Sequence, residues 1–123
     1  MPRWSNDELS RIGTAGELKI ATARSDGALR SFVPVWVVRV GDDLFVRAYR
    51  GRTGSWFRQA VHSGRGLVRA GGVERQVTFE EGDLAATELI DAAYRDKYGR
   101  GMYVDAMLAP AAVEATLNLV RAA

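Results

Sequence analysis

The stretch ELKIATARSDGALRSFVPVWVVRVGDDLFVRAYR, residues 17–50, decides the fold of this 123-residue chain. Apolar and polar side chains alternate along residues 17–22 and again along residues 44–49, which is typical of β-strands. Between these segments, residues 32–40 are apolar on both faces of an extended chain, which predicts a central or doubly covered strand. The stretch therefore predicts three consecutive strands.

Two short turns separate these strands. Ser25-Asp26-Gly27-Ala28 and Gly41-Asp42-Asp43 both contain glycine, which reaches the positive φ values that tight hairpins need. Pro34 interrupts the middle strand, because proline has no N–H to donate to a neighbouring strand. We therefore expect an antiparallel meander with a bulge or a sheet edge at Pro34.

The segment before this stretch predicts a helix. Ser5 and Glu8 form a capping-box pattern, in which each residue satisfies a free backbone N–H near the helix start. Leu9 and Ile12 supply a short apolar stripe, and Gly16 ends the helix.

The segments after the stretch alternate between helix and strand. Residues 55–63 predict a short helix between two glycines, and residues 66–83 predict a hairpin that turns at Gly71-Gly72. Residues 83–98 predict a longer helix with an apolar face and an Asp91–Arg95 pair on its opposite face. Its apolar face holds Ala86, Leu89, Ile90, Ala93, Tyr94 and Tyr98. The tail is ambiguous: its alanine content favours helix, whereas ATLNLV, residues 115–120, is compatible with a closing strand.

The order of these elements predicts one domain, residues 1–123, that is mainly β with helices. Six short strands in antiparallel hairpins favour a small barrel with helices over its ends. The doubly apolar segment 32–40 also predicts a homodimer, because one of its faces would be buried against a partner.

The composition excludes several kinds of chemistry. The chain has no cysteine and a single histidine, His62, so thiolate nucleophiles, disulfides and His-rich metal sites are excluded, and we expect no metal. Arginine supplies fifteen of the seventeen basic residues, in a chain of net charge +2. No apolar run is long enough to span a membrane, and the first ten residues lack the apolar core of a signal peptide. We therefore expect a cytoplasmic protein.

The segment FVRAYRGRTGSWFRQ, residues 45–59, is the strongest candidate binding motif. It holds four arginines and no acidic residue, and a glycine-containing loop leads from a strand into a helix start. Arginine forks and free helix N–H groups both bind phosphate oxygens. Ser55 or Thr53 could cap the helix or hold a phosphate, and Trp56 offers a stacking surface. The alternative to a phosphate site is that this segment is only a solvated surface loop. A weaker alternative is that Gly51 to Gly54 form a G-x-x-G loop like that of RNA-binding KH domains.

Other candidates have plain structural explanations. Arg24 could reach the same anion, and Trp36 beside Pro34 could border a ring, although a core tryptophan is commoner. We expect His62 on the surface and Lys97 extended along an apolar patch beside Tyr94 and Tyr98.

The sequence resembles an uncharacterised family of small bacterial proteins. The resemblance rests on Pro34-Val-Trp36, Val46-Arg47, Gly51, Gly54-Ser-Trp56, Gly72 and Ala93-Tyr94-Arg95-x-Lys97-Tyr98. That family is similar to the FMN-binding split β-barrels, which include pyridoxamine-phosphate-oxidase-like proteins and deazaflavin-dependent nitroreductases. The resemblance implies a six-stranded antiparallel split barrel whose third-strand loop and following helix help to hold a cofactor phosphate.

Three functional hypotheses follow. In the first, the protein is a flavin- or deazaflavin-binding oxidoreductase with FMN or a deazaflavin as cofactor. Its phosphate would be held by Arg47, Tyr49, Arg50, Gly51, Ser55 and Arg58, and its ring would be bordered by Pro34, Trp36 and Trp56. In the second, a non-catalytic homodimeric module binds another anionic or aromatic small molecule in the same cleft. The third, nucleic-acid binding through the arginine loop, is weaker.

Overall fold

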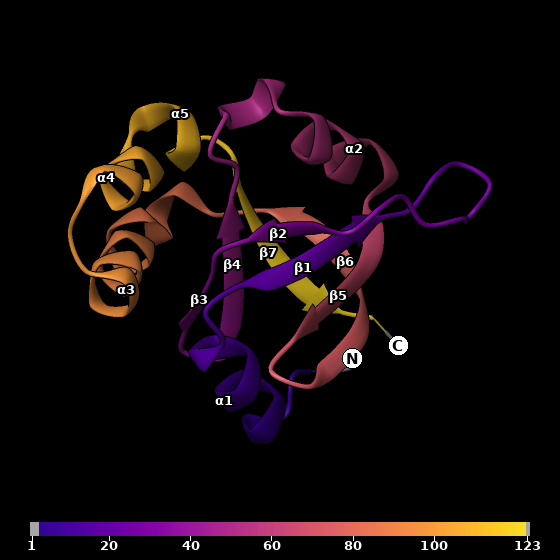
Figure 1. Cartoon of the computed structure of the whole chain (residues 1–123), viewed down its shortest axis with the longest axis horizontal. Coiled ribbons are helices and arrows are strands. Elements are labelled where there is room, and N and C mark those ends of the chain that lie inside the picture. Colours follow the sequence, from indigo (N-terminus) through magenta and orange to yellow (C-terminus); the bar gives the residue numbers. More distant parts are fainter. Residues whose placement is uncertain (1–2, 123) are drawn as a thin grey trace.

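The computed structural model describes residues 3–122, which form one antiparallel sheet and five α-helices (Figure 1). The strands are β1 (Leu18–Thr22), β2 (Val33–Val35), β3 (Val37–Val40), β4 (Asp43–Arg47), β5 (Arg65–Ala70), β6 (Val73–Glu81) and β7 (Thr116–Arg121). The helices are α1 (Asn6–Thr14), α2 (Ser55–Ser63), α3 (Thr87–Tyr98), α4 (Met102–Leu108) and α5 (Pro110–Val113). Short 3-10 turns, η1 (Gly51–Thr53) and η2 (Leu84–Ala86), precede α2 and α3.

The sheet curls into a nearly closed barrel. Its strand order is β2-β1-β5-β6-β7-β4-β3, and all neighbouring strands are antiparallel. β2 and β3 lie at the two ends of this order but are separated in sequence only by Trp36. One segment of chain therefore leaves one edge of the sheet and joins the other, which confirms the expected split barrel.

The structure corrects two predictions about the strands. Residues 32–40 form two strands and not one, and the sheet has seven strands instead of six. The segment breaks at Trp36, where the chain changes partner from β1 to β4. Pro34 lies in β2, an end strand of the sheet, so its missing N–H costs no ladder bond, as the sequence predicted. Val35 and Val37 face the barrel core and Val38 faces α3, so this chain covers its own apolar segment. The apolar pattern is therefore no argument for a dimer.

Two apolar cores lie on opposite sides of the barrel wall. The first fills the barrel and includes Leu44, Val46 and Ala48 of β4 and its continuation, together with Phe57 of α2. The second lies outside the wall, where Phe45 packs with side chains of α3 and α4. The predicted alternation along β4 is thus confirmed, because successive side chains enter different cores.

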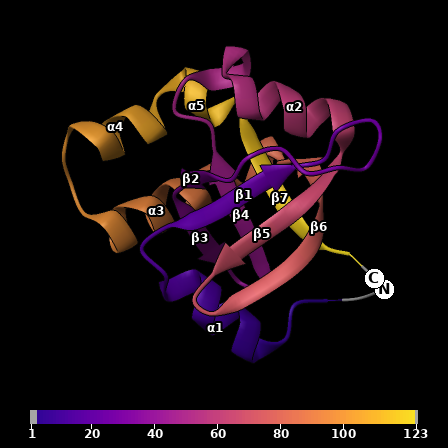
Figure 2. The same cartoon turned by 45° about the vertical axis from the view of Figure 1, so that its right-hand side comes forward.

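Helix α1 covers one end of the barrel and α2 the other, while α3, α4 and α5 gather on one side (Figures 1 and 2). The predicted capping box is confirmed: Glu8 N donates to Ser5 Oγ at 3.1 Å, and Ser5 N donates to Glu8 Oε1 at 2.9 Å. Burial would raise the pKa of Glu8, but the Ser5 amide, Arg121 and Arg75 outweigh it and lower that pKa. The same carboxylate therefore caps α1 and ties it to β6 and β7.

Three further expectations need correction. The longer helix begins at Thr87 after a 3-10 turn, and Leu89 on its predicted apolar face is exposed. Asp91 pairs with Arg47 of β4 and not with Arg95. The ambiguous tail contains both of its alternatives, because α4 and α5 precede the closing strand β7. The N-terminal helix, the α2 helix and the hairpin that turns at Gly71-Gly72 lie where the sequence predicted them.

Candidate functional site

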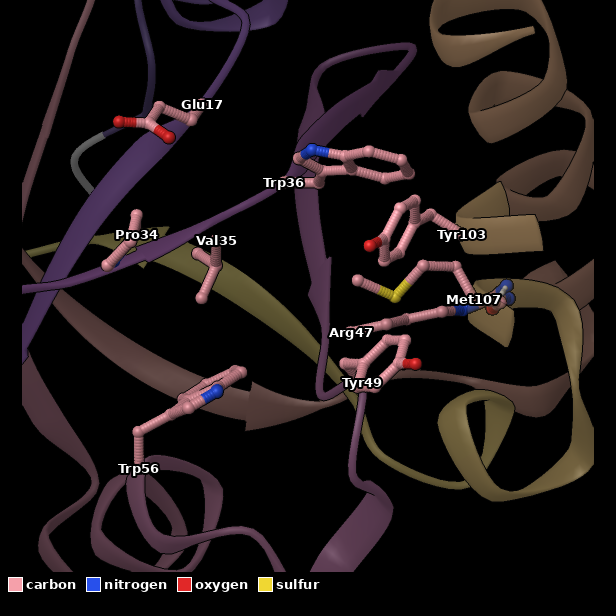
Figure 3. A pocket seen from close by; sticks show the side chains of 9 residues that line it. All are labelled: Glu17, Pro34, Val35, Trp36, Arg47, Tyr49, Trp56, Tyr103 and Met107. Carbon is pink, nitrogen blue, oxygen red and sulfur yellow. Dashed lines mark hydrogen bonds between the residues drawn. The ribbon is translucent and has the colours of Figure 1, made fainter. Parts of the chain in front are cut away.

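A cleft of about 490 Å³ lies where the chain crosses between the two edges of the sheet (Figure 3). Side chains from β2, the Trp36 crossing, β4, α2 and α4 line it, and most of them are apolar or aromatic. They are Glu17, Pro34, Val35, Trp36, Arg47, Tyr49, Trp56, Tyr103 and Met107. An aromatic-walled space of this size suits a flat organic ligand.

A second cavity of about 470 Å³ adjoins the cleft and shares Tyr49 and Trp56 with it. Its other walls come from the start of β2, from the segment after β4 and from the residues at the start of α2. These residues are Val33, Ala48, Arg50, Thr53, Gly54 and Ser55. The two spaces together form one groove, aromatic at one end and polar at the helix start.

The polar end offers donors to an anion. Gly54 is the N-cap of α2 and has no side chain to accept from the first-turn N–H groups. Neither Ser55 nor Thr53, the two residues that the sequence offered as possible caps, is the N-cap, and Ser55 is the first helical residue. Free N–H groups and the helix dipole attract negative charge at such a position. Arg50 is exposed beside them and forms no ion pair within residues 3–122.

Trp36 is held in the cleft wall by the end of α3. Its ring stacks on Tyr98 with a centroid distance of 4.0 Å and an interplanar angle of 5°. The Tyr98 hydroxyl donates to Gly16 O at 2.9 Å, and Lys97 Nζ donates to Val37 O at 2.5 Å. Lys97 thus holds the chain just after the crossing at Trp36, and Tyr98 holds the segment just before β1.

Two tyrosines form the rim on the same side of the cleft as Trp36 (Figure 3). Tyr49 and Tyr103 lie with ring centroids 6.4 Å apart and rings tilted by 46° (Figure 3). Tyr49 is 55% exposed and Tyr103 is 68% exposed. The cleft is therefore open on this side, where a ligand can enter.

Arg47 lies in the wall of the cleft but its guanidinium is committed elsewhere. Arg47 Nη1 donates to Asp91 Oδ1 at 2.6 Å and to Met107 O at 2.9 Å, and Nε donates to Thr116 Oγ1 at 3.0 Å. The side chain is fully buried, and in Figure 3 its nitrogens lie beyond Met107 and not in the open cleft. Arg47 therefore joins β4 to α3, α4 and β7.

The other arginines of residues 45–59 also differ in whether they are free to contact a ligand in the groove. Arg52 makes a two-point ion pair with Glu81, with Nη1 2.5 Å from Oε1 and Nη2 3.2 Å from Oε2, and it also donates to Glu114 O. Hydrogen bonding to Arg52 lowers the pKa of Glu81, although burial opposes this shift. Arg58 faces a different pocket on the far side of α2. Only Arg50 lies at the polar end of the groove.

The structure brings together seven of the nine predicted site residues along the groove: Pro34, Trp36, Arg47, Tyr49, Arg50, Ser55 and Trp56. The Arg47 guanidinium is engaged elsewhere, and Arg58 lines a different pocket, as described above. Gly51 lines neither space; it has φ +71°, and a Cβ there would lie 3.3 Å from Ala111 O, so glycine allows the loop to pack on α5.

The residues that sequence reasoning missed come mainly from α4. Tyr103 and Met107 are four residues apart, which places them on one face of a helix, but the tail sequence did not establish a helix. Glu17, at the start of β1, is the only carboxylate that lines the cleft.

Two kinds of feature are absent from residues 3–122. No group of three or more Asp, Glu or His side chains is positioned to share a metal ion. No helix in this range is both long and apolar enough to cross a bilayer.

Fold and groove together define a split β-barrel protein with an aromatic cleft beside a helix N-terminus. The chain belongs to the bacterial family described as "Uncharacterized protein conserved in bacteria (DUF2255)", whose model matches residues 8–119. The sequence matches no curated protein.

Solved structures share this fold. A protein titled F420 reductase has 16% identity and a TM-score of 0.58, with 92% of this chain and 90% of that chain covered. An FAD-binding protein from Mesorhizobium loti has 13% identity and a TM-score of 0.57, with 99% and 93% covered. An FAD and heme binding protein from Mycobacterium smegmatis has 20% identity and a TM-score of 0.55, with 96% and 66% covered. Identities this low establish the fold alone.

Proposed function

We propose that this protein binds a flavin or deazaflavin cofactor in the groove and acts as an oxidoreductase on a small substrate. The observation that supports the proposal most strongly is the continuity of the groove: an aromatic cleft opens into a polar cavity at the N-terminus of α2, and the two share Tyr49 and Trp56. A flavin has the same division, with a flat ring at one end and a phosphate at the other. The structural neighbours that bind FAD or are titled F420 reductase have the same fold.

The residues of the groove fit such a cofactor. Trp36, Trp56 and Tyr103 would border the ring, and Pro34 and Val35 supply the apolar wall beside them. Arg50 and the first-turn N–H groups of α2 would hold the phosphate, with the Ser55 or Thr53 hydroxyl as a further donor. Arg47 and Arg58 are left out of this set because their guanidinium groups lie elsewhere.

The chain itself has a limited part in the chemistry. A bound flavin or deazaflavin supplies hydride transfer, so no protein nucleophile is needed. The side chains of the cleft bind and orient the ring and keep water from its buried face. The opening between Tyr49 and Tyr103 admits the substrate.

Binding of FMN compared with riboflavin, which lacks the phosphate, tests this assignment. We expect the purified protein to quench FMN fluorescence saturably, and Arg50→Gln to weaken FMN binding about tenfold, the usual loss for a charged hydrogen bond. Riboflavin binding should be unaffected by Arg50→Gln but weakened by Trp56→Ala. The control Arg95→Gln removes an exposed arginine of α3 and should change neither affinity.

The proposal is wrong if neither FMN nor a deazaflavin binds. An equal loss of riboflavin and FMN affinity in Arg50→Gln would show that the phosphate lies elsewhere. Turnover of a bound, reduced cofactor by added acceptors separates an oxidoreductase from a module that only binds.

We also propose that the protein forms a homodimer through the surface beside the opening of the cleft. Exposed apolar side chains gather at this rim, where Tyr103 lies beside Met102, which is 83% exposed. Light scattering should give twice the monomer mass, and Met102→Glu should give a monomer. Val61→Glu, which places the same charge at an exposed position on α2, should leave the dimer intact. A monomeric wild-type protein would contradict this assembly without affecting the test of flavin binding.

Nucleic-acid binding through the arginine loop is not supported by this arrangement. Arg47 is buried in an ion pair and Arg52 is neutralised by Glu81, so the loop lacks the row of free cations that a phosphate backbone requires.

A further inference from the structure

A separate pocket of about 400 Å³ lies beside the C-terminal half of α2. Its walls come from α2 and from the long loop between β1 and β2, which extends beside this helix (Figures 1 and 2). The lining residues are Ala23, Ser25, Arg30, Arg58, Gln59 and His62. It shares no residue with the groove of the proposed cofactor site.

The lining is rich in hydrogen-bond donors and contains no carboxylate. Arg30 and Arg58 can only donate, and neither forms an ion pair within the part of the chain that the structure describes. Asp26, an acidic residue of the same loop, accepts from Ala28 N at 2.9 Å and so closes its own turn. The positive charge of the pocket is therefore not balanced by its lining.

Two details show that these donors are left without acceptors from the described chain. Arg30 Nε is buried and has no hydrogen-bond partner, which is costly for a charged group. Gln59 Oε1 accepts from Thr22 Oγ1 at 3.4 Å, so its amide oxygen is engaged and its NH₂ group is left to donate. An anion in the pocket would give the arginine and glutamine side chains that line it an acceptor.

We propose that Arg30, Arg58 and His62 form a second anion-binding site, which takes a phosphate or carboxylate group of a small ligand. The two guanidinium groups supply paired donors of the kind that such groups accept. His62 and Ser25 complete the set with side chains that donate or accept as the ligand requires. This site does not depend on the proposed function, because it lies outside the groove.

Titration of the flavin-free protein with inorganic pyrophosphate, at constant ionic strength, tests the site. Amide NMR signals of residues 24–30 and 58–62 should shift saturably. Arg58→Gln should raise the dissociation constant about tenfold or more, and Arg30→Gln with Arg58→Gln should abolish saturation. Arg58 is exposed on a helix, so the single variant keeps the test valid if the double variant fails to fold.

The matched control is Arg95→Gln with Arg100→Gln, which removes two charges from exposed positions at the end of α3. Its dissociation constant should remain within about twofold of wild type, because only long-range attraction is lost. Shifts that do not saturate, shifts confined to residues 50–56, or an equal loss in the control would each overturn the proposal.

The same variants identify the source of the anionic group. If Arg58→Gln weakens binding of FAD but not of FMN, the pocket holds an anionic extension of the molecule in the groove. If FAD and FMN affinities are unchanged while pyrophosphate binding is lost, the pocket serves a separate ligand.

Discussion

Arg47 and Asp91 are 44 positions apart in sequence and form an ion pair, with Arg47 Nη1 2.6 Å from Asp91 Oδ1. The arginine side chain is fully buried and the aspartate is 20% exposed. The guanidinium also lies 5.3 Å from the centre of the Tyr94 ring. This ion pair attaches α3 to the barrel wall behind the cleft. It also keeps Arg47, the first arginine of residues 45–59, from contacting a ligand in the cleft.

Removal of the Asp91 carboxylate should reveal the free-energy cost of burying the Arg47 charge without its partner. We expect Asp91→Ala to lower the free energy of unfolding by about 3 kcal/mol, because the buried Arg47 charge loses its partner. Asp96→Ala, at an exposed position on the same helix, should cost less than about 1 kcal/mol. Urea unfolding measures both, and equal losses would mean that the ion pair contributes nothing beyond helix composition.

Lys97 should make stability depend on pH in the alkaline range. Burial lowers the pKa of Lys97 to about 8, so between pH 8 and the ordinary lysine pKa the unfolded chain binds more protons than the folded chain. Stability should therefore rise as the pH increases from about 8. Burial raises the pKa of Tyr98 to about 12 and also raises that of Tyr94, so stability should fall again above pH 10, where unfolded tyrosines ionise.

Urea unfolding of Lys97→Met between pH 7 and pH 10 isolates the contribution of this group. The rise from pH 8 should be reduced in Lys97→Met and retained in Lys19→Met, which changes the exposed lysine of β1. An identical rise in stability with pH in both variants would mean that other titrating groups cause the rise.

Tyr98 should act on the cleft through Trp36. Tyr98→Leu removes the ring that stacks on Trp36 at 4.0 Å. Tyr98→Phe keeps the ring and loses only the hydroxyl, which hydrogen-bonds to Gly16 O and to the backbone of Val37. Aromatic stacking contributes about 1 kcal/mol, so we expect Tyr98→Leu to weaken riboflavin binding about fivefold and Tyr98→Phe to change it by less than twofold. Fluorescence titration of both folded variants decides between them; an equal loss would implicate the hydroxyl.

Gly66 should tolerate no side chain, because β1 passes close to it. A Cβ at Gly66 would lie 2.3 Å from Ala21 O, whereas a Cβ at Gly16 would meet nothing within 4 Å. We expect Gly66→Ala to cost about 2 kcal/mol or more in the free energy of unfolding, and Gly16→Ala to be nearly neutral. Thermal unfolding checks both, and a neutral Gly66→Ala would mean that β1 and β5 separate without cost.

Much of the fold could be predicted because its signals are local. Ser5 and Glu8 lie within one helical turn, and the alternation from Leu44 to Ala48 spans a single strand, so neighbouring residues alone indicate the capping box and the two faces of β4. The break at Trp36 could not be predicted in the same way. Residues 32–40 have one continuous apolar pattern, and only the closing of the barrel makes the chain exchange β1 for β4 at that position.

The candidate site was only partly predictable for the same reason. The sequence placed arginines, glycines and aromatic residues before a helix start, and those nearest the start, Arg50, Ser55 and Trp56, do lie along the groove. Which arginines remain free was decided by partners far along the chain: Asp91 takes Arg47, and Glu81 takes Arg52.

The sequence by itself determined most of the strands, most of the helices and the stretch of chain that carries the site, because hydrophobic periodicity and capping act between residues a few positions apart. Only the tertiary structure decided where the sheet closes and which charges face a ligand. Both depend on contacts between residues that are distant in sequence, such as the hydrogen bond from the Tyr98 hydroxyl to Gly16 O. A charged side chain is available to a ligand only when no ion pair within the protein has already neutralised it.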